Sequence, residues 1–246
     1  MWFRILLLQL CLPFAVLAQS SASPKLPYQL RLLCVEVSKG AENLLIIEKL
    51  DDVWTPRWRL KVSSGFLADS LGFSGLKLGL AIDPSPPLSS SPFNGPPVAV
   101  TEKLEGIKPF YELEISKDPS ICVLLANPEG SEKPGPYQVF FMNTNRKSYG
   151  AERILVQNFS LSQITGVLGG KSVDLPPGKT EIVELGADQL GDMAQITLQS
   201  KESEGLRVLY DTRWPVKTDC RRSLLILPKE DGSLLPYLIP EYPPFP

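Results

Sequence analysis

The residue types and spacings that support catalysis are sparse in this chain, and the most suggestive motif is Gly166-Val-Leu-Gly-Gly-Lys-Ser172. Glycine amides, a lysine and a serine are the parts of a phosphate-binding loop. That loop needs four residues between its first glycine and the Gly-Lys-Ser, whereas Gly166 leaves three, and it must open a helix. Pro176-Pro177-Gly178 would end such a helix within a turn. We therefore predict a β-hairpin turn at Gly169-Gly170, because this turn needs positive φ angles that glycine tolerates.

The chain contains no histidine, which limits its possible reactions. This absence removes Ser-His-Asp and Cys-His catalysis, histidine-ligated zinc or iron, and the commonest general base near neutral pH. Carboxylate and lysine chemistry remain, as in glycoside hydrolysis. The acidic candidates are Glu112, Glu114, Asp118, Glu181, Glu184 and Asp211. Glu112 and Glu114 alternate with apolar residues and so project from one strand face. We predict no catalytic residue, no cofactor and no metal site, with a hydrolase that uses a carboxylate pair as the alternative.

Tryptophan and arginine gather in two segments, VWTPRWRLKV (53–62) and YDTRWPVK (210–217). The candidate binding residues are Trp54, Arg57, Trp58, Arg59, Tyr210, Arg213 and Trp214. Exposed tryptophan beside arginine can stack on a sugar ring or anchor a protein partner. The alternative is that each tryptophan packs inside the fold while its arginine lies along the outer face.

The amino terminus has the pattern of an export signal. Arg4 precedes the mainly apolar run Ile5–Leu17, and Ala18 offers a small residue for cleavage before a polar stretch. We predict a cleaved signal peptide at residues 1–18 and a periplasmic or secreted protein. The apolar run is too short for a transmembrane helix, and we predict no transmembrane segment after cleavage. With 25 basic and 27 acidic residues, the chain has no net positive charge to attract nucleic acid.

Three cysteines remain once Cys11 leaves with the signal: Cys34, Cys122 and Cys220. An odd number permits one internal disulfide at most, and Cys34 with Cys122 is the candidate pair because both lie in apolar runs of the same half. The alternative is three buried thiols, since free cysteine is among the most buried residue types.

Short apolar runs bounded by turn residues fill the chain and predict an all-β fold. The predicted strands are 28–37, 43–50, 58–63, 76–82, 98–104, 110–115, 121–126, 137–143, 153–160, 164–168, 171–175, 180–185, 194–200, 206–212, 223–228 and 234–239. Only 66–73 and 186–194 could hold a helical turn. The proline-rich tail 237–246 is expected to lie extended against a neighbour or to fray.

Two segments, 121–141 and 222–239, share a pattern of apolar strand, polar turn and second strand. Each closes a half of the chain that opens with a similar strand, which favours an internal duplication. We predict two tandem immunoglobulin-like β-sandwich domains, at 25–147 and 150–242, with one large sandwich as the alternative. The loop 83–97 is predicted to offer a contact surface.

The second half contains the segments RILVQNFS, LGGKSVDLPPGKTEIV, VLYDTRWPV and RRSLLILP. With these segments it resembles uncharacterised exported β-sandwich proteins of Verrucomicrobia-like bacteria. The resemblance implies export and a β architecture, and it brings no activity, cofactor or site. The expectation from the whole sequence is an exported, non-catalytic protein that binds a protein or polysaccharide at the cell envelope or serves as an assembly component.

Overall fold

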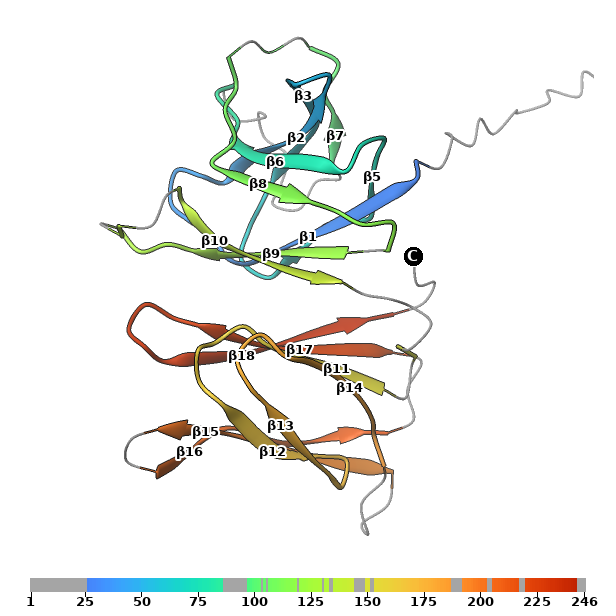
Figure 1. Cartoon of the computed structure of the whole chain (residues 1–246), viewed down its shortest axis with the longest axis vertical. Coiled ribbons are helices and arrows are strands. Elements are labelled where there is room, and N and C mark those ends of the chain that lie inside the picture. The colour runs from blue at the N-terminus through green and yellow to red at the C-terminus, as the bar shows by residue number, and fades with distance from the viewer. Residues whose placement is uncertain are drawn as a thin grey trace, which may run out of the picture.

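The computed structural model describes residues 26–85, 97–102, 104, 106–118, 120–129, 131–132, 135–143, 149–150, 153–186, 192–202, 205–216 and 220–242. Within these residues the chain forms strands and no helix, so the prediction of an all-β fold is confirmed (Figure 1). The predicted signal peptide and most of the predicted contact loop 83–97 lie outside the described residues.

The first half of the chain forms two sheets. Its strands are β1 (Tyr28–Glu36), β2 (Asn43–Leu50), β3 (Val53–Lys61), β4 (Phe66–Leu67), β5 (Leu71–Phe73), β6 (Lys77–Ile82), β7 (Val98–Ala99), β8 (Tyr111–Glu114), β9 (Ser120–Ala126) and β10 (Tyr137–Asn143). The first inner sheet has the order β10-β9-β1-β4, and β5 also pairs with β1. The first outer sheet has the order β7-β3-β2-β6-β8.

The second half of the chain forms two further sheets. Its strands are β11 (Arg153–Asn158), β12 (Ile164–Leu168), β13 (Lys171–Leu175), β14 (Thr180–Glu184), β15 (Met193–Glu202), β16 (Gly205–Pro215), β17 (Arg221–Pro228) and β18 (Leu234–Glu241). The second inner sheet has the order β14-β11-β17-β18, and the second outer sheet has the order β13-β12-β15-β16.

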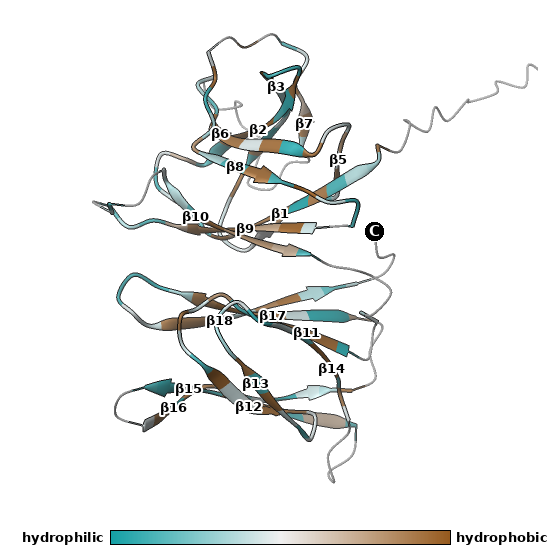
Figure 2. Cartoon of the chain, in the orientation of Figure 1, coloured by the Kyte–Doolittle hydropathy of each residue, from teal (hydrophilic) through white to brown (hydrophobic). Residues whose placement is uncertain are grey.

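The four sheets stack as layers, with the two inner sheets facing each other (Figure 1). One core fills each half, and a third core lies between the two inner sheets. Leu32 and Leu33 are neighbours on β1 and belong to different cores, because successive strand residues point to opposite faces. Strands buried on both faces are nearly continuously hydrophobic, as Figure 2 shows for β9. The third core joins the two halves through buried apolar surface.

The two halves have the same topology. In each inner sheet the first strand of the half pairs in parallel with a late strand, β1 with β9 and β11 with β17. The orders β10-β9-β1-β4 and β18-β17-β11-β14 correspond strand for strand, as do β3-β2-β6-β8 and β13-β12-β15-β16. This is the arrangement that a duplication predicts.

The immunoglobulin-like part of the prediction is not confirmed. Constant-type immunoglobulin domains arrange their strands as ABED and CFG, whereas each inner sheet here contains a central parallel pair. No strand pairing in the described part of the chain joins the two halves. The domain boundaries at 25–147 and 150–242 stay a prediction, because the third core packs the halves together.

The motif Gly166–Ser172 is a hairpin, as predicted. β12 and β13 pair up to Leu168 and Lys171, and the turn residues Gly169 and Gly170 have φ angles of 55° and 81°. A Cβ on Gly169 would also lie 2.7 Å from the backbone nitrogen of Gly186. Glycine is therefore required at this position by both conformation and space.

The expectation of a helical turn at 66–73 was wrong. This segment supplies the short strands β4 and β5, which both pair with β1. Its residues Ala68, Leu71 and Phe73 are buried in the first core, so the strand register of the sheet outweighs any local helical preference. The other candidate turn, 186–194, lies partly outside the described residues.

Candidate functional site

Trp54, one of the candidate binding residues, borders two recesses. It lies at the start of β3, opposite Lys49 of β2, and is half-buried. The inner part of its side chain packs with Leu45, Ile47 and Ala81, on the face of the first outer sheet that points away from the first core. The segment that follows β7 covers part of this face through Val100, Leu104 and Ile107. Trp54 therefore stands at the margin of the covered area, held by apolar contacts.

Two recesses meet at Trp54. One, of about 250 Å³, is lined by Lys49, Trp54, Lys77, Leu78, Glu112, Leu113 and Glu114. The other, of about 400 Å³, is lined by Asp52, Val53, Trp54, Thr55, Pro56, Glu102, Leu104, Gly106 and Ile107. The ammonium nitrogen of Lys49 lies 5.7 Å from the Trp54 ring centroid and 3.4 Å from Oδ1 of Asp52. The lining of the recesses at Trp54 thus includes both hydrogen-bond donors, from lysines, and acceptors, from carboxylates.

Arg57 and Arg59 are committed to ion pairs. Nε of Arg57 donates to Oε2 of Glu48 at 2.6 Å, and Glu48 is fully buried. Arg59 pairs with the buried Asp83 and lies 3.6 Å from Oε1 of Glu102. The side chains of these two arginines therefore make structural contacts within the first outer sheet. Because Glu102 also lines the larger recess, Arg59 helps to position that wall.

Trp58 lies on the opposite face of β3 from Trp54. It packs against the first core, and its Nε1 donates to the carbonyl of Gly72 at 3.2 Å. The two tryptophans therefore do not form one surface. The bulge in the pairing of β3 with β2 falls beside Pro56, where a missing backbone N–H is tolerated.

The second candidate cluster is largely internal. Trp214 is 7% exposed, belongs to the second core and meets Tyr210 edge-on at 5.9 Å between ring centroids. Arg222, which the sequence did not single out, lies over Trp214 at 5.7 Å. Arg213 is exposed on β16. Tyr210 is half-buried, so a binding surface at Tyr210 and Arg213 stays a prediction, whereas Trp214 has the alternative, buried role.

Two of the acidic candidates line a recess at Trp54. Glu112 and Glu114 share one face of β8 and line the smaller recess side by side. Glycosidases instead place their two carboxyl groups on either side of the scissile bond. Asp211 accepts a hydrogen bond from Thr197 at 2.9 Å, and Glu181 lies 3.2 Å from Lys179. In the described residues, no group of three or more acidic or cysteine side chains could hold a metal ion.

The candidate disulfide between Cys34 and Cys122 is not formed, and both residues are buried free thiols, which was the alternative. In the parallel pairing of β1 with β9, Cys34 lies opposite Leu124, two residues from Cys122. A rise of roughly 3.3 Å per residue and a strand spacing of roughly 4.8 Å put the two Cα atoms about 8 Å apart. This exceeds the roughly 7 Å that a disulfide can bridge.

Thiol titration should confirm the reduced state. Burial raises the pKa of Cys34 and of Cys122 to about 12, so neither forms the reactive thiolate near pH 8. We expect the folded protein, produced without residues 1–18, to react negligibly with a thiol-specific chromogenic reagent at this pH. After unfolding in guanidinium without reductant, three thiols per chain should react, namely Cys34, Cys122 and Cys220. A single reactive thiol would contradict the structure.

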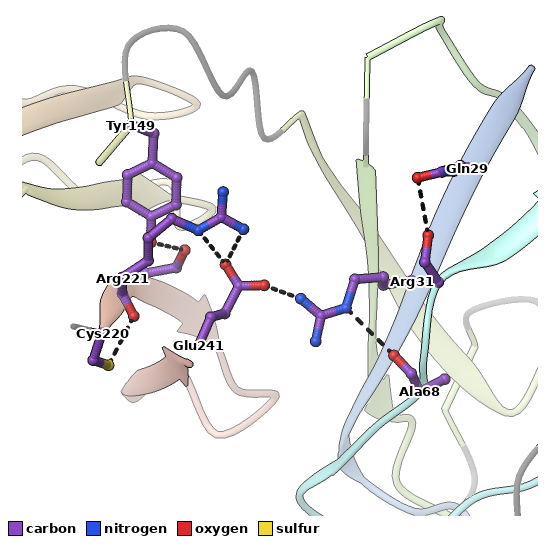
Figure 3. A network of polar contacts seen from close by, with 9 residues as sticks. Gln29, Arg31, Ala68, Tyr149, Cys220, Arg221 and Glu241 are labelled. Carbon is purple, nitrogen blue, oxygen red and sulfur yellow. Dashed lines mark hydrogen bonds and ion pairs between the residues drawn. The ribbon is translucent and has the colours of Figure 1, made fainter. Parts of the chain in front are cut away.

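Sequence reasoning missed the ion network that joins the two halves (Figure 3). Glu241 of β18 pairs with Arg31 of β1 and accepts two hydrogen bonds from Arg221, at 3.0 and 2.7 Å. Arg221 also lies over the Tyr149 ring at 4.9 Å, and Tyr149 shares a 2.9 Å hydrogen bond with Ser223. No sequence signal could reveal this cluster, because Arg31 and Glu241 are 210 residues apart.

In the described part of the chain, no helix has the length and apolar character needed to cross a membrane. The resemblance to uncharacterised exported proteins stays a prediction. The sequence matches no protein-family model, and no curated protein is significantly similar to it.

Proposed function

We propose that this chain is an exported, non-catalytic binding protein that binds a polysaccharide at the cell envelope through the surface around Trp54. The observation that carries the proposal is that Trp54 lines two recesses while its side chain packs against the apolar cluster of Leu45, Ile47 and Ala81. Export rests on the signal-like pattern of residues 1–18. A protein ligand or a role in assembly is the other form of the same proposal.

An indole ring suits the apolar face of a sugar. Pyranose rings present C–H groups on their faces, and a flat aromatic side chain offers a large contact area at a small entropic cost. The contacts of Trp54 with Leu45, Ile47 and Ala81 restrict its rotamer before any ligand arrives. Less conformational entropy is therefore lost on binding.

The polar rim suits sugar hydroxyl groups. Hydroxyls both donate and accept, and the smaller recess offers ammonium donors from Lys49 and Lys77 and carboxylate acceptors from Glu112 and Glu114. The larger recess adds the carboxylates of Asp52 and Glu102. Two recesses that both include Trp54 in their lining fit a chain of sugar units better than a single small molecule.

The non-catalytic form of the proposal is supported by two features. The chain has no histidine, and the two acidic side chains of the smaller recess, Glu112 and Glu114, stand side by side on one strand face. If the protein is instead a hydrolase that uses a carboxylate pair, the candidate pair is Glu112 and Glu114, because both line a recess of the proposed sugar site.

The test is retention of the mature protein by polysaccharides. The protein would be run in native gels containing soluble glucans, xylan or mannan, and incubated with insoluble cellulose, chitin and peptidoglycan. Trp54→Ala is expected to lower the affinity for the retained polysaccharide at least tenfold, because a central aromatic contact contributes about 2 kcal/mol or more. Trp54→Phe should retain part of the affinity.

The matched control is Tyr242→Ala, which removes a side chain that is 67% exposed and lies outside both recesses. It should bind as the unmodified protein does. Equal retention of Trp54→Ala and the unmodified protein would overturn the proposal. Release of reducing ends that disappears in Glu112→Gln or Glu114→Gln would favour the hydrolase.

A further inference from the structure

The turn between β2 and β3, Asp51-Asp52, has an unusual conformation for its residue types. Leu50 and Val53 pair across it, so the hairpin has a two-residue loop. Both loop residues have positive φ angles, 48° at Asp51 and 63° at Asp52, as a type I′ turn requires. In the part of the chain that the structure describes, every other residue with a positive φ is a glycine.

The second position of this turn is the exception. Asp-Gly is one of the preferred pairs for a type I′ turn, so Asp51 suits the first position, whereas glycine is usual at the second. A residue with a Cβ is less stable than glycine in the left-handed conformation. Local conformation alone therefore favours glycine at position 52, and the advantage of aspartate there lies in its side chain.

The Asp52 carboxylate contacts a lysine beside the candidate binding surface. Its Oδ1 lies 3.4 Å from Nζ of Lys49, and this Nζ lies 5.7 Å from the centroid of the Trp54 ring, within the range of a cation–π interaction. The side chain of Lys49 is 29% exposed, whereas that of Asp52 is 97% exposed. The carboxylate thus restrains the ammonium group from the solvent side, close to the indole ring.

The charges at this position indicate a class of ligand. The smaller recess at Trp54 is lined by two lysines and two glutamates, Lys49, Lys77, Glu112 and Glu114. These four charges cancel, and the Asp52 carboxylate adds a negative charge at Lys49. The carboxylate of an acidic sugar would meet like charge here, which disfavours it. Hydroxyl groups of a neutral sugar can accept from the lysines and donate to the carboxylates.

We propose that Asp52 determines the specificity of the Trp54 surface: it holds the Lys49 ammonium group at the indole ring and neutralises it, so that the surface binds an uncharged polysaccharide. This role depends on the proposed polysaccharide binding at Trp54. Asp52 is a positioning residue, because it acts through Lys49. A lysine that is already restrained loses less conformational entropy when a sugar hydroxyl binds to it.

The experiment compares Asp52→Asn with Asp51→Asn in affinity gels that contain xylan, mannan, a soluble glucan or polygalacturonate. Each variant loses one negative charge and keeps a residue type that tolerates positive φ, and Asp51 lines neither recess. Asp52→Asn should bind the preferred neutral polysaccharide about threefold more weakly, which equals about 0.65 kcal/mol and lies within the range of exposed ion pairs. It should bind polygalacturonate more tightly, because Lys49 is no longer neutralised. Asp51→Asn should bind both as the unmodified protein does.

Two measurements without ligand separate positioning from a structural role. The ring current of Trp54 should shift the NMR signals of the Lys49 methylene protons next to the ammonium group, and this shift should decrease in Asp52→Asn but not in Asp51→Asn. Asp52→Gly should raise the midpoint of urea unfolding, since Asp-Gly suits the turn, and still weaken binding to the neutral polysaccharide. A merely structural role would change stability and affinity in the same direction.

The possible outcomes distinguish the role of Asp52 from the proposed function. Equal affinities of Asp52→Asn and Asp51→Asn, or unchanged Lys49 proton shifts in Asp52→Asn, would overturn the role of Asp52. A lower urea midpoint in Asp52→Gly would also count against it, because the aspartate would then serve the turn. Binding of polygalacturonate by the unmodified protein as tightly as the neutral polysaccharides would overturn the ligand class. If no polysaccharide binds, the proposed function fails and the role of Asp52 fails with it.

Discussion

Replacing Glu241 with alanine is expected to lower the free energy of unfolding by about 3–5 kcal/mol, the usual loss when one partner of a buried ion pair is removed. The side chains of Glu241 and Arg221 are 3% and 4% exposed, and that of Arg31 is 18% exposed. Burial, and then the charge of Arg221, lower the pKa of Arg31. Without the carboxylate, Arg31 and Arg221 would both lose the anion that they share in this seam.

The measurement is urea unfolding followed by tryptophan fluorescence. Trp54 and Trp58 report on the first half, and Trp214 reports on the second. Glu241→Gln keeps the shape and removes the charge, so it separates loss of charge from loss of packing. Glu129→Ala breaks the exposed pair with Lys39 and should cause no measurable change. A loss below about 1 kcal/mol in Glu241→Ala would show that the network does not stabilise the fold.

Replacing Asn158 with alanine is expected to cost about 2–4 kcal/mol, because its fully buried side chain makes four hydrogen bonds. Its Nδ2 donates to the carbonyls of Ser162 and Leu175, both at 2.8 Å. Its Oδ1 accepts from the backbone nitrogen and the hydroxyl of Ser160, at 2.9 and 2.6 Å. Alanine would leave buried carbonyls and the Ser160 hydroxyl without these partners.

The same unfolding experiment checks this prediction. Asn158→Asp keeps the acceptor for Ser160, loses both donors and buries a charge, so at neutral pH it should be at least as unstable as Asn158→Ala. Asn143→Ala is the control, since Asn143 is exposed and its contact with Asp118 is 3.5 Å long. If Asn158→Ala and Asn143→Ala had equal stability, the network around Asn158 would not contribute as the geometry implies.

Local pattern predicted the strands well. The ranges 43–50, 137–143, 164–168 and 171–175 agree with β2, β10, β12 and β13 residue for residue. The short-range rules behind these ranges, apolar runs ended by turn residues, act within a few positions of the chain. The segment 98–104 was predicted too long, and β7 covers only Val98–Ala99. There the chain leaves the sheet edge to cover the face that contains Ile47 and Ala81.

The candidate site was predicted only in part. The sequence identified Trp54 and Trp58 together, yet the two side chains occupy opposite faces of β3, because a bulge beside Pro56 shifts the pairing with β2. The alternation of apolar and polar residues along a strand does not reveal where a bulge lies. The tail from 237 onward was expected to lie extended against a neighbour or to fray, and as far as Glu241 it is extended, as part of β18 paired with β17. What the sequence did not indicate is that Glu241 contributes the carboxylate that joins the two halves.

The sequence by itself determined the all-β class, the hairpin at Gly169-Gly170 and the exclusion of histidine chemistry, because each depends on residue type or on local conformation. Only the tertiary structure decided which side chains meet. The triad of Arg31, Glu241 and Arg221 depends on how the two inner sheets stack, and the open side of Trp54 depends on the bulge in β3. That stacking follows from apolar area buried over whole sheet faces, a sum over residues distant in sequence that no short motif can encode.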